Sequence, residues 1–404
     1  MNFNKYIQNY FLALFSIIPL TIIAGSAVSV INILLIDLSF IIFIIYKKKF
    51  YFIKNKTIIY FFILYFYLIF NSFISVDYSE GFLRNFGFLR IIILFVAINY
   101  FFKNEIFFKK VFKFWSLVIF IVLIDVLIES FTGKNILGFG GEIYHQRIVS
   151  FFKDEPIVGG YLNGFFLIII GFLFNEFKDN RNYLIILFSI IFIISILLTG
   201  ERSNTLKAIF GISFFFILYK NLNLKKKVII VLTTILLIFV MAFNSNFLKV
   251  RFVYQINHLL NQNNIYFKLY DSAFEVFKNH KLLGVGNKNY RVETCNEEKS
   301  KKNIKYFCTT HPHQIYFEFL SEHGLIGSII ILSIFYKLIF SKILGTIREK
   351  NYVKIGSLIY LLFVFSPVIP SGAFFNNYVL TIFAINLSIF YASDKNLNIF
   401  KKIR

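Results

Sequence analysis

The chain has 404 residues, of which 57% are hydrophobic and only 16% are charged. A mean hydropathy of +0.69 excludes an ordinary soluble protein, because a chain of this length cannot hide so much apolar surface from water. The net charge of +22 does not indicate nucleic-acid binding, since the lysines gather between apolar runs and form no basic stripe on a soluble domain. We therefore predict a polytopic membrane protein with no nucleic-acid partner.

Continuous apolar runs, each close to the ~20 residues that a helix needs to cross a bilayer, recur along the whole chain. Because they do not alternate polar and apolar residues, they predict helices rather than the strands of a barrel. The first run is interpreted as an uncleaved helix, although it also has the form of a signal peptide. About twelve spans are predicted, at residues 8–26, 28–46, 58–75, 84–101, 109–129, 160–177, 182–199, 205–220, 226–243, 323–341, 353–371 and 375–391.

Basic residues between these runs predict the orientation of the chain. When the spans are counted, one side receives the clusters at 47–49, 103–110, 178–181, 225–227, 342–350 and 401–404. That side is expected to be cytoplasmic and to hold both termini. Two larger segments, 130–159 and 244–322, are then expected on the outer side.

The 244–322 segment holds both cysteines, Cys295 and Cys308. Since disulfides persist in oxidising compartments, we expect the two to pair; two free thiols are the alternative. The bond would close a small loop in front of His311 and would stabilise the fold by about 3 kcal/mol.

The same segment predicts two short helices. Leu269, Ala273 and Val276 recur at helical spacing, and Gly284 ends the pattern. A second helix is expected to begin at Pro312 and to lead directly into the next apolar run, so its polar groups would lie at the membrane surface.

His311 and His313 flank that proline. Histidine is the side chain best suited to accept a proton near neutral pH, so a general base or a phosphate-binding imidazole is the leading interpretation. A structural or solvated histidine is the alternative. A metal site is disfavoured, because neither cysteine has a suitable spacing to the histidines.

Three arginines indicate an anion site on the outer side. Arg202 lies in a short turn, Arg147 lies in an outer segment, and Arg90 lies inside a predicted span, where an ionised side chain is expensive. Because arginine binds phosphate oxygens with two parallel hydrogen bonds, converging arginines suggest a pyrophosphate. Arg84 is interpreted as a side chain that reaches toward lipid headgroups.

Several motifs of nucleotide chemistry are absent from the sequence. It has no Asp-x-Asp pair, no P-loop and no Gly-x-Gly-x-x-Gly turn. Neither a nucleotide-driven pump nor a soluble nucleotide-sugar enzyme is predicted, and no cofactor is expected.

Four stretches together resemble the O-antigen ligase and polymerase superfamily: RIVSFFKDEPIVGGYL, GERSNTLKAIFGI, LLGVGNKNYR and HPHQIYFEFLSEHGLIG. In this resemblance the motif histidine falls on His313, and the arginine after the seventh span falls on Arg202. Two positions depart from the family pattern. Gln314 stands where asparagine is usual, and Tyr266 stands where the family has an arginine, with Lys268 nearby.

The resemblance implies a GT-C-like membrane glycosyltransferase fold without a nucleotide domain. It implies transfer of a glycan from undecaprenyl diphosphate to a hydroxyl of lipid A–core, at the periplasmic face of a bacterial inner membrane. Cationic side chains would balance the diphosphate without a metal, and an imidazole would accept the acceptor's proton. The expected catalytic residues are His313 and Arg202, and the expected substrate-binding residues are Arg90, Arg147, Lys268, Arg291, His311, Gln314 and Glu322, the last with a structural role as its alternative.

Two other functions stay open. A polymerase of the same superfamily would join lipid-linked repeats instead of transferring them to lipid A–core. A polysaccharide transporter or flippase would suit twelve helices and a buried Arg90, although the 244–322 segment is larger than transport loops usually need.

Overall fold

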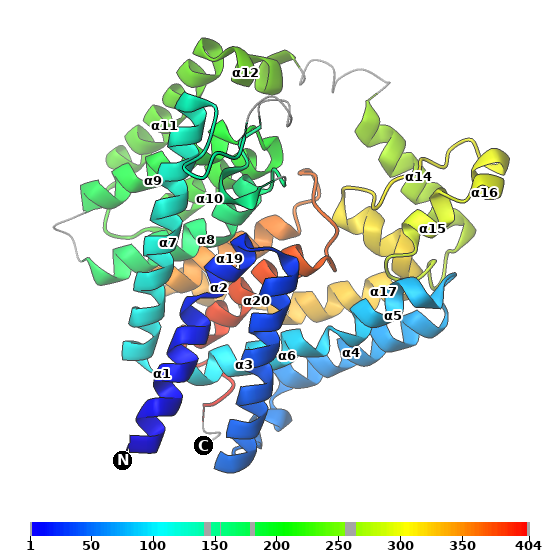
Figure 1. Ribbon diagram of the computed structural model, residues 1–404, viewed down its shortest axis with the longest axis horizontal. Coiled ribbons are helices and arrows are strands. Elements are labelled where there is room, and N and C mark those ends of the chain that lie inside the picture. The colour runs from blue at the N-terminus through cyan, green and yellow to red at the C-terminus, as the bar shows by residue number, and fades with distance from the viewer. Residues whose placement is uncertain (1, 141–146, 154, 178–181, 255–263, 402–404) are drawn as a thin grey trace.

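The computed structural model describes residues 2–140, 147–153, 155–177, 182–254 and 264–401, and these form helices joined by turns, with no strand (Figure 1). The first helices are α1 (Asn2–Ser16), α2 (Ile18–Ile23), α3 (Ser26–Lys47), η1 (Tyr51–Lys54), α4 (Lys56–Phe73), α5 (Tyr78–Phe86), α6 (Leu89–Phe101), α7 (Glu105–Thr132), η3 (Ser150–Phe152), α8 (Val158–Glu176), α9 (Asn182–Leu198) and α10 (Arg202–Leu218). There follow α11 (Leu224–Asn244), α12 (Asn246–Lys249), η4 (Val250–Tyr254), α14 (Ile265–Asn279), α15 (Tyr290–Thr294), α16 (Glu297–Lys302), α17 (Ile315–Leu338), η5 (Phe340–Lys342), α18 (Ile343–Arg348), α19 (Tyr352–Val364) and α20 (Asn377–Ala392). The prediction of an all-α polytopic membrane protein is confirmed.

The helix lengths do not support the expected count of twelve spans. In the described chain seven segments are long and apolar enough to cross a membrane, and a bent pair, α11 with α12 and η4, would make eight. Other apolar helices are shorter: α9 has 17 residues, α20 has 16 and α19 has 13. At 1.5 Å per residue α19 is about 20 Å long, less than the ~30 Å hydrocarbon core. The seven are Lys5–Ile23, Ser26–Lys47, Lys56–Phe73, Tyr78–Phe101, Glu105–Thr132, Val158–Glu176 and Ile315–Arg348.

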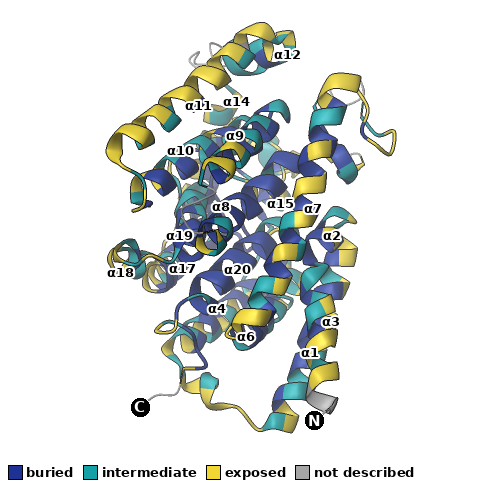
Figure 2. Ribbon diagram, turned by 90° about the vertical axis from the view of Figure 1, so that its left-hand side faces the viewer, coloured by how far each residue is buried: buried dark blue, intermediate teal, exposed yellow. Residues whose placement is uncertain are grey.

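The helices α8, α19 and α20 form the buried centre of the molecule, whereas α11 is mostly exposed (Figure 2). Glycines let α8 and α19 approach each other closely. A Cβ atom on Gly171 would lie 2.3 Å from the backbone oxygen of Tyr352, and one on Gly356 would lie 2.2 Å from that of Leu167. Larger residues at these two positions would force the helices apart, so this contact depends on the sequence of both helices.

The start of α1 and the C-terminal segment lie at the same end of the bundle (Figure 1). Here the backbone oxygen of Phe400 accepts hydrogen bonds from the Tyr51 hydroxyl (3.2 Å) and from the Lys103 ammonium (3.3 Å). We call this the terminal end. The turns that follow α3 and α6 therefore both contact the C-terminal segment.

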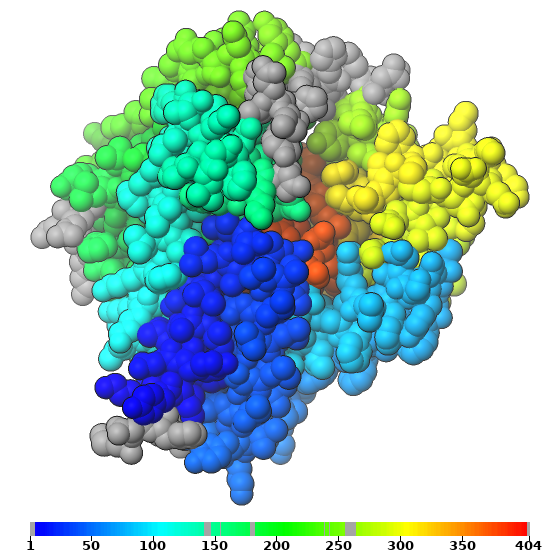
Figure 3. All heavy atoms as spheres, viewed as in Figure 1, coloured from blue at the N-terminus to red at the C-terminus, as the bar shows by residue number. Residues whose placement is uncertain are grey.

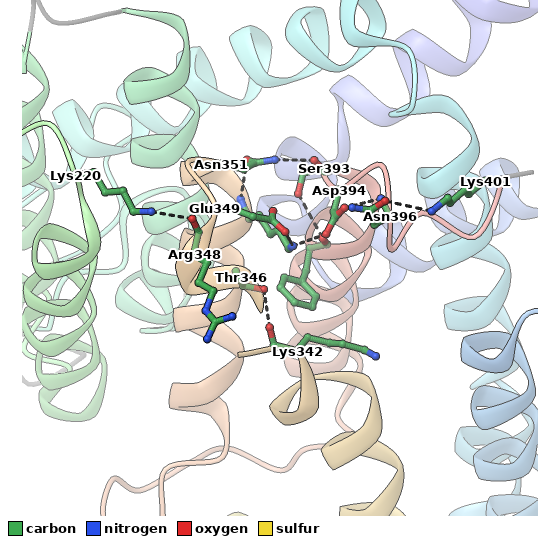
Figure 4. Close-up of polar contacts among 12 residues, drawn as sticks. Lys220, Lys342, Thr346, Arg348, Glu349, Asn351, Ser393, Asp394, Asn396 and Lys401 are labelled. Atoms are coloured by element: carbon green, nitrogen blue, oxygen red, sulfur yellow. Dashed lines mark hydrogen bonds and ion pairs between the residues drawn. The ribbon is translucent and has the colours of Figure 1, made fainter. Parts of the chain in front are cut away.

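A buried ion cluster joins α19 to the end of α20 at the terminal end. Lys354, in the first turn of α19, is 2% exposed, and its ammonium lies 2.8 Å from a Glu349 oxygen and in contact with Asp394. Beside it the Asn351 amide donates to the backbone oxygen of Ser393 at 2.6 Å (Figure 4). The cation is thus balanced by two carboxylates.

The helix α17 begins at Ile315, with Gln314 as its N-cap, rather than at Pro312 as predicted. It continues into the predicted span but is broken at Gly324, whose φ is +63°. A Cβ atom at Gly324 would lie 2.4 Å from the backbone of Leu282. The break lets the chain just after α14 pack directly against α17, so the amphipathic turn and the span form one bent element.

The predicted amphipathic helix is α14, which buries Leu269, Ala273 and Val276. Its Ser272 hydroxyl joins two later segments, because it contacts the Tyr290 hydroxyl at 2.9 Å and accepts from the backbone N–H of Phe307 at 3.0 Å. Cys295 and Cys308, the two cysteines expected to pair, form a disulfide with Cα atoms 4.5 Å apart. The segment just before the histidines is therefore tied to α14 through Phe307 and to Cys295 through Cys308.

Candidate functional site

A cavity of about 510 Å³ lies between α8, α10, α17, α19 and α20, at the ends of α19 and α20 that are remote from the Lys354 cluster. In Figure 3 the orange surface of the segment before α20 is visible between the blue N-terminal helices and the yellow part of the 244–322 segment. Four cations against two carboxylates line the cavity, together with a histidine. These residues are Arg84, Lys207, Lys288, Arg291, Glu155, Glu201 and His311.

One wall of the cavity is the loop 371–376, which is held by α17 and by the residue before its cap. The backbone oxygen of His313 accepts from the Ser371 N–H at 2.9 Å. Both carboxylate oxygens of the buried Glu318 accept from the Phe374 N–H, at 2.9 and 3.0 Å. These hydrogen bonds tie the loop to the start of α17.

The carboxylates near the cavity do not neutralise all of its cations. Glu80 lies 2.8 Å from Lys288 and 3.6 Å from Arg291. Arg84 and Lys207, in contrast, form no salt bridge within the described ranges. Two cations therefore face the cavity without a salt bridge, although Arg84 also interacts electrostatically with the buried Glu318 and Glu322. This arrangement favours an anionic ligand.

Glu201 has its charge compensated in another way. Its carboxylate accepts from the backbone N–H groups of Gly159 (2.7 Å) and Gly160 (3.1 Å) and from the Asn204 amide (2.7 Å). The first two groups lie in the first turn of α8, where the helix dipole favours a negative charge. Glu201 thus joins α8 to α10 at the cavity.

The two histidines contact each other, with ring centres 4.0 Å apart. His311 lines the cavity, and its Nδ1 lies 3.0 Å from the Thr310 hydroxyl, whereas its buried Nε2 has no hydrogen-bond partner. Burial lowers the pKa of His311 to about 3, with smaller contributions from His313 and Arg84, and burial also lowers the pKa of His313. Both imidazoles are therefore neutral at pH 7 and able to accept a hydrogen bond.

His313 differs from His311 in its backbone. Its φ of +58° lies in the left-handed region that few non-glycine residues adopt. This conformation directs its carbonyl to the loop 371–376. The side chain is not among the residues that line the cavity.

Arg202 and Arg147 belong to a second group of cations close to Glu201. Arg202 is the first residue of α10, and its buried Nη1 has no hydrogen-bond partner. Arg147 donates from Nη2 to the Pro156 oxygen at 2.9 Å, and its Nε is also unpartnered. Arg251 interacts electrostatically with both arginines and donates to the Gly200 oxygen at 3.0 Å. These three arginines adjoin the cavity but are not part of its lining.

The remaining expected residues fall in different places. Arg291 lines the cavity. Arg90 donates from Nη2 to Asn377 at 2.7 Å, at the start of α20. Lys268 is exposed on α14 and is not among the lining residues.

Gln314 and Glu322 both make structural contacts. The Gln314 oxygen accepts from the N–H groups of Tyr316 (2.6 Å) and Phe317 (3.1 Å), which caps α17. Buried Glu322 accepts from the Tyr290 N–H at 3.3 Å and so holds the turn before α15.

Sequence reasoning missed four cations of this region. Arg84 was interpreted as reaching toward lipid but lines the cavity, as do Lys207 and Lys288. Lys207 follows Arg202 on the same short helix, and Lys288 lies inside the LLGVGNKNYR stretch, so both were within recognised motifs. Arg251 carried no sequence signal that separates it from other basic residues of its segment.

No group of three histidine, cysteine, aspartate or glutamate residues that could hold a metal occurs among the residues that the structure describes. A search of curated proteins found no match to the chain. A family model described as O-antigen ligase matches residues 187–332, a stretch that runs from α9 into α17 and includes Arg202, His311 and His313. This match supports a relationship of residues 187–332 to the O-antigen ligase superfamily.

Proposed function

We propose that the protein is a metal-independent, inverting glycosyltransferase that moves an undecaprenyl-diphosphate-linked glycan to a hydroxyl group of lipid A–core. One observation carries this proposal. A cavity with cations that form no salt bridge adjoins a pair of neutral imidazoles, and the imidazoles and part of the cavity lining belong to the stretch that matches the O-antigen ligase model. A lipid diphosphate needs a cationic site at the membrane surface, and a hydroxyl nucleophile needs a base beside it.

The donor diphosphate would lie beside α10. Arg202 and Arg147 would contact its oxygens, and Lys207 would extend the same charge into the cavity. These groups stabilise the negative charge that develops on the diphosphate as it leaves. Lys268 is exposed on α14 and does not line the cavity. It would contact the diphosphate only if ligand binding drew it closer.

The acceptor hydroxyl would attack the anomeric carbon while the bond from that carbon to the diphosphate oxygen breaks. The proton of the hydroxyl passes to the imidazole of His313, with His311 as the neighbour that orients the hydroxyl. One displacement inverts the configuration at the anomeric carbon. This displacement requires neither an electron donor nor a metal.

The topology proposed for this function has twelve crossings. The short helices α9, α10, α19 and α20 would each cross a locally thin part of the bilayer. Both termini would be cytoplasmic, and the cavity, with segments 130–159 and 244–322, would face the periplasm of the inner membrane. A cysteine-accessibility scan that labels Lys301→Cys only from the cytoplasm would contradict this orientation.

The proposal is tested with His313→Ala and Arg202→Ala in a strain that lacks the chromosomal copy. Each variant should transfer glycan at least 100-fold more slowly, while Lys301→Ala, on the exposed face of α16, should transfer normally. Normal amount and length of surface glycan in both variants would refute the mechanism. If the deletion strain instead accumulated glycan of a single repeat, the protein would be a polymerase, and transfer only along an imposed gradient would indicate a transporter.

A further inference from the structure

A second set of cations lines the cavity from elements other than α10. Arg84 comes from α5, Lys288 from the turn before α15, and Arg291 from α15 itself. Glu80 contacts two of them, at 2.8 Å from Lys288 and 3.6 Å from Arg291. Arg84 forms no salt bridge in the described chain and interacts at longer range with the buried Glu318 and Glu322. All three cations nevertheless line the cavity, and this set is separate from the arginines beside α10.

Buried asparagines fix the position of these cations. Asn289 accepts from the Asp77 N–H at 2.7 Å and donates to the Asp77 oxygen at 3.1 Å. Asn287 donates its backbone N–H to the side chain of Asn71 at 2.8 Å, and its amide contacts Asn85. These asparagines are at most 1% exposed. The turn that presents Lys288 is thereby fastened to the helix that presents Arg84, before any ligand binds.

Two glycines let the turn pack closely against its neighbours. A Cβ atom on Gly81 would lie 2.6 Å from the backbone oxygen of Asn287, and one on Gly286 would lie 2.2 Å from the Cβ of Ser75. Lys288 itself has a φ of +65°, a strained value for a lysine. The surrounding contacts must compensate for this strain.

We infer that Arg84, Lys288 and Arg291 form a second anion subsite, which binds a phosphate or carboxylate group of the acceptor glycan. The inference rests on the proposed function for the donor diphosphate, which occupies the arginines beside α10. Arg84 acts electrostatically on His311, so an anion at Arg84 lies on the histidine side of the cavity, where the acceptor hydroxyl must be. The protein would thus select acceptors that carry a negative charge near the reacting hydroxyl.

The subsite is tested by binding of small anions to the purified full-length protein in detergent, at an ionic strength held constant with chloride. Methyl glucuronide and inorganic phosphate probe the two chemical classes, and pyrophosphate probes the donor site. At least one of the first two should raise the melting temperature saturably, and should still do so when pyrophosphate is saturating. Complete displacement by pyrophosphate would overturn the inference, because it would mean one shared site.

Variants assign the binding to residues. Arg84→Gln with Arg291→Gln should weaken binding of the active probe about tenfold, because two charge-assisted contacts are lost, while Lys301→Gln should leave it unchanged. This pair keeps the Lys288–Glu80 contact, so the fold should persist, and Arg84→Lys serves as a milder variant. Equal weakening by Arg202→Gln would place the anion beside α10 and overturn the inference.

The same set of proteins separates this inference from the proposed function. If no variant or wild-type protein transfers glycan but the double variant still loses the probe selectively, the proposed function fails and the anion subsite stands as a binding site. If transfer proceeds and neither methyl glucuronide nor phosphate binds, the proposed function stands and the subsite is refuted.

Discussion

Lys354 and the cations of the cavity lie at opposite ends of α19 and α20 and have opposite surroundings. At the terminal end Lys354 is 2% exposed and contacts both Glu349 and Asp394. At the cavity Arg84 and Lys207 form no salt bridge in the described part of the chain. The same kind of charge is therefore neutralised where it joins helices and left available where it borders a cavity.

The difference shows what a positive charge can do in a membrane protein. A buried cation with two carboxylates contributes to the docking of helices, because removal of any partner leaves an uncompensated charge. A cation that borders a cavity without a salt bridge keeps its capacity to attract an anion. The two ends can thus be distinguished by experiment, one through stability and the other through binding.

The strongest test of this contrast is Lys354→Met. The change leaves two carboxylates without a cation at the junction of α19 and α20, which should destabilise the fold by about 3–5 kcal/mol. The measurement is thermal or denaturant unfolding of the purified protein in detergent.

Arg84→Met is the matched control, because it removes a cation that forms no salt bridge in the described chain and interacts with Glu318 and Glu322 only at longer range. Its unfolding free energy should change by about 1 kcal/mol or less. Equal losses in the two variants would contradict the division of cations into structural and available ones.

The disulfide gives the next largest effect. Cys295→Ser with Cys308→Ser should lower the unfolding free energy by about 3 kcal/mol, since the bond restricts the unfolded chain. Loss of the disulfide should increase local unfolding more at the cavity than at the Lys354 cluster, because Thr310 and His311 follow Cys308 closely and line the cavity. Hydrogen exchange should rise in residues 306–314 and stay unchanged in α19, and a uniform rise would argue against this local role.

Much of the fold was predictable from the sequence, because an apolar run is a local property. The runs, the amphipathic α14 and the cysteine pair each appear in the structure. The number of membrane crossings was less predictable, since helix length depends on where tertiary contacts end a helix. α19 ends at Val364, inside the predicted span 353–371, and α20 begins at Asn377, inside the predicted span 375–391. Both helices are therefore shorter than predicted.

The site was predictable only where a motif marked it. His311 and Arg291, which lie in or beside recognised motifs, line the cavity, and their roles stay predictions. Arg84 also lines the cavity, but its place there depends on the docking of the 284–290 turn on α5. Contacts between segments about 200 residues apart, such as Asn287 with Asn85, leave no local pattern. The catalytic roles of His313 and Arg202 stay predictions.

Glu201→Gln tests a carboxylate that belongs to the cavity but is compensated by backbone groups. Glutamine keeps one acceptor oxygen for Gly159 or Gly160 but loses the charge at the start of α8, so we expect a loss of about 2 kcal/mol. Unfolding measurements on this variant and on Glu155→Gln, which is exposed, provide the comparison. An equal effect in both would show that the helix contact contributes little.

The smallest effect concerns the pH dependence of stability. The pKa of His311 is about 3 in the folded protein, mainly because of burial and then because of His313 and Arg84, and about 6.5 in an unfolded chain. Between these values the unfolded state binds more protons, so stability falls as the pH decreases below 6.5. Wild type should lose about 1 kcal/mol relative to His311→Gln between pH 6.5 and 5.5, and the two should run parallel above pH 7.5. Arg84 and His313 remain in both proteins, so the comparison isolates His311. If the two stability curves ran parallel below pH 6.5 as well, His311 would be accessible to water and would not be held neutral beside the charged wall of the cavity.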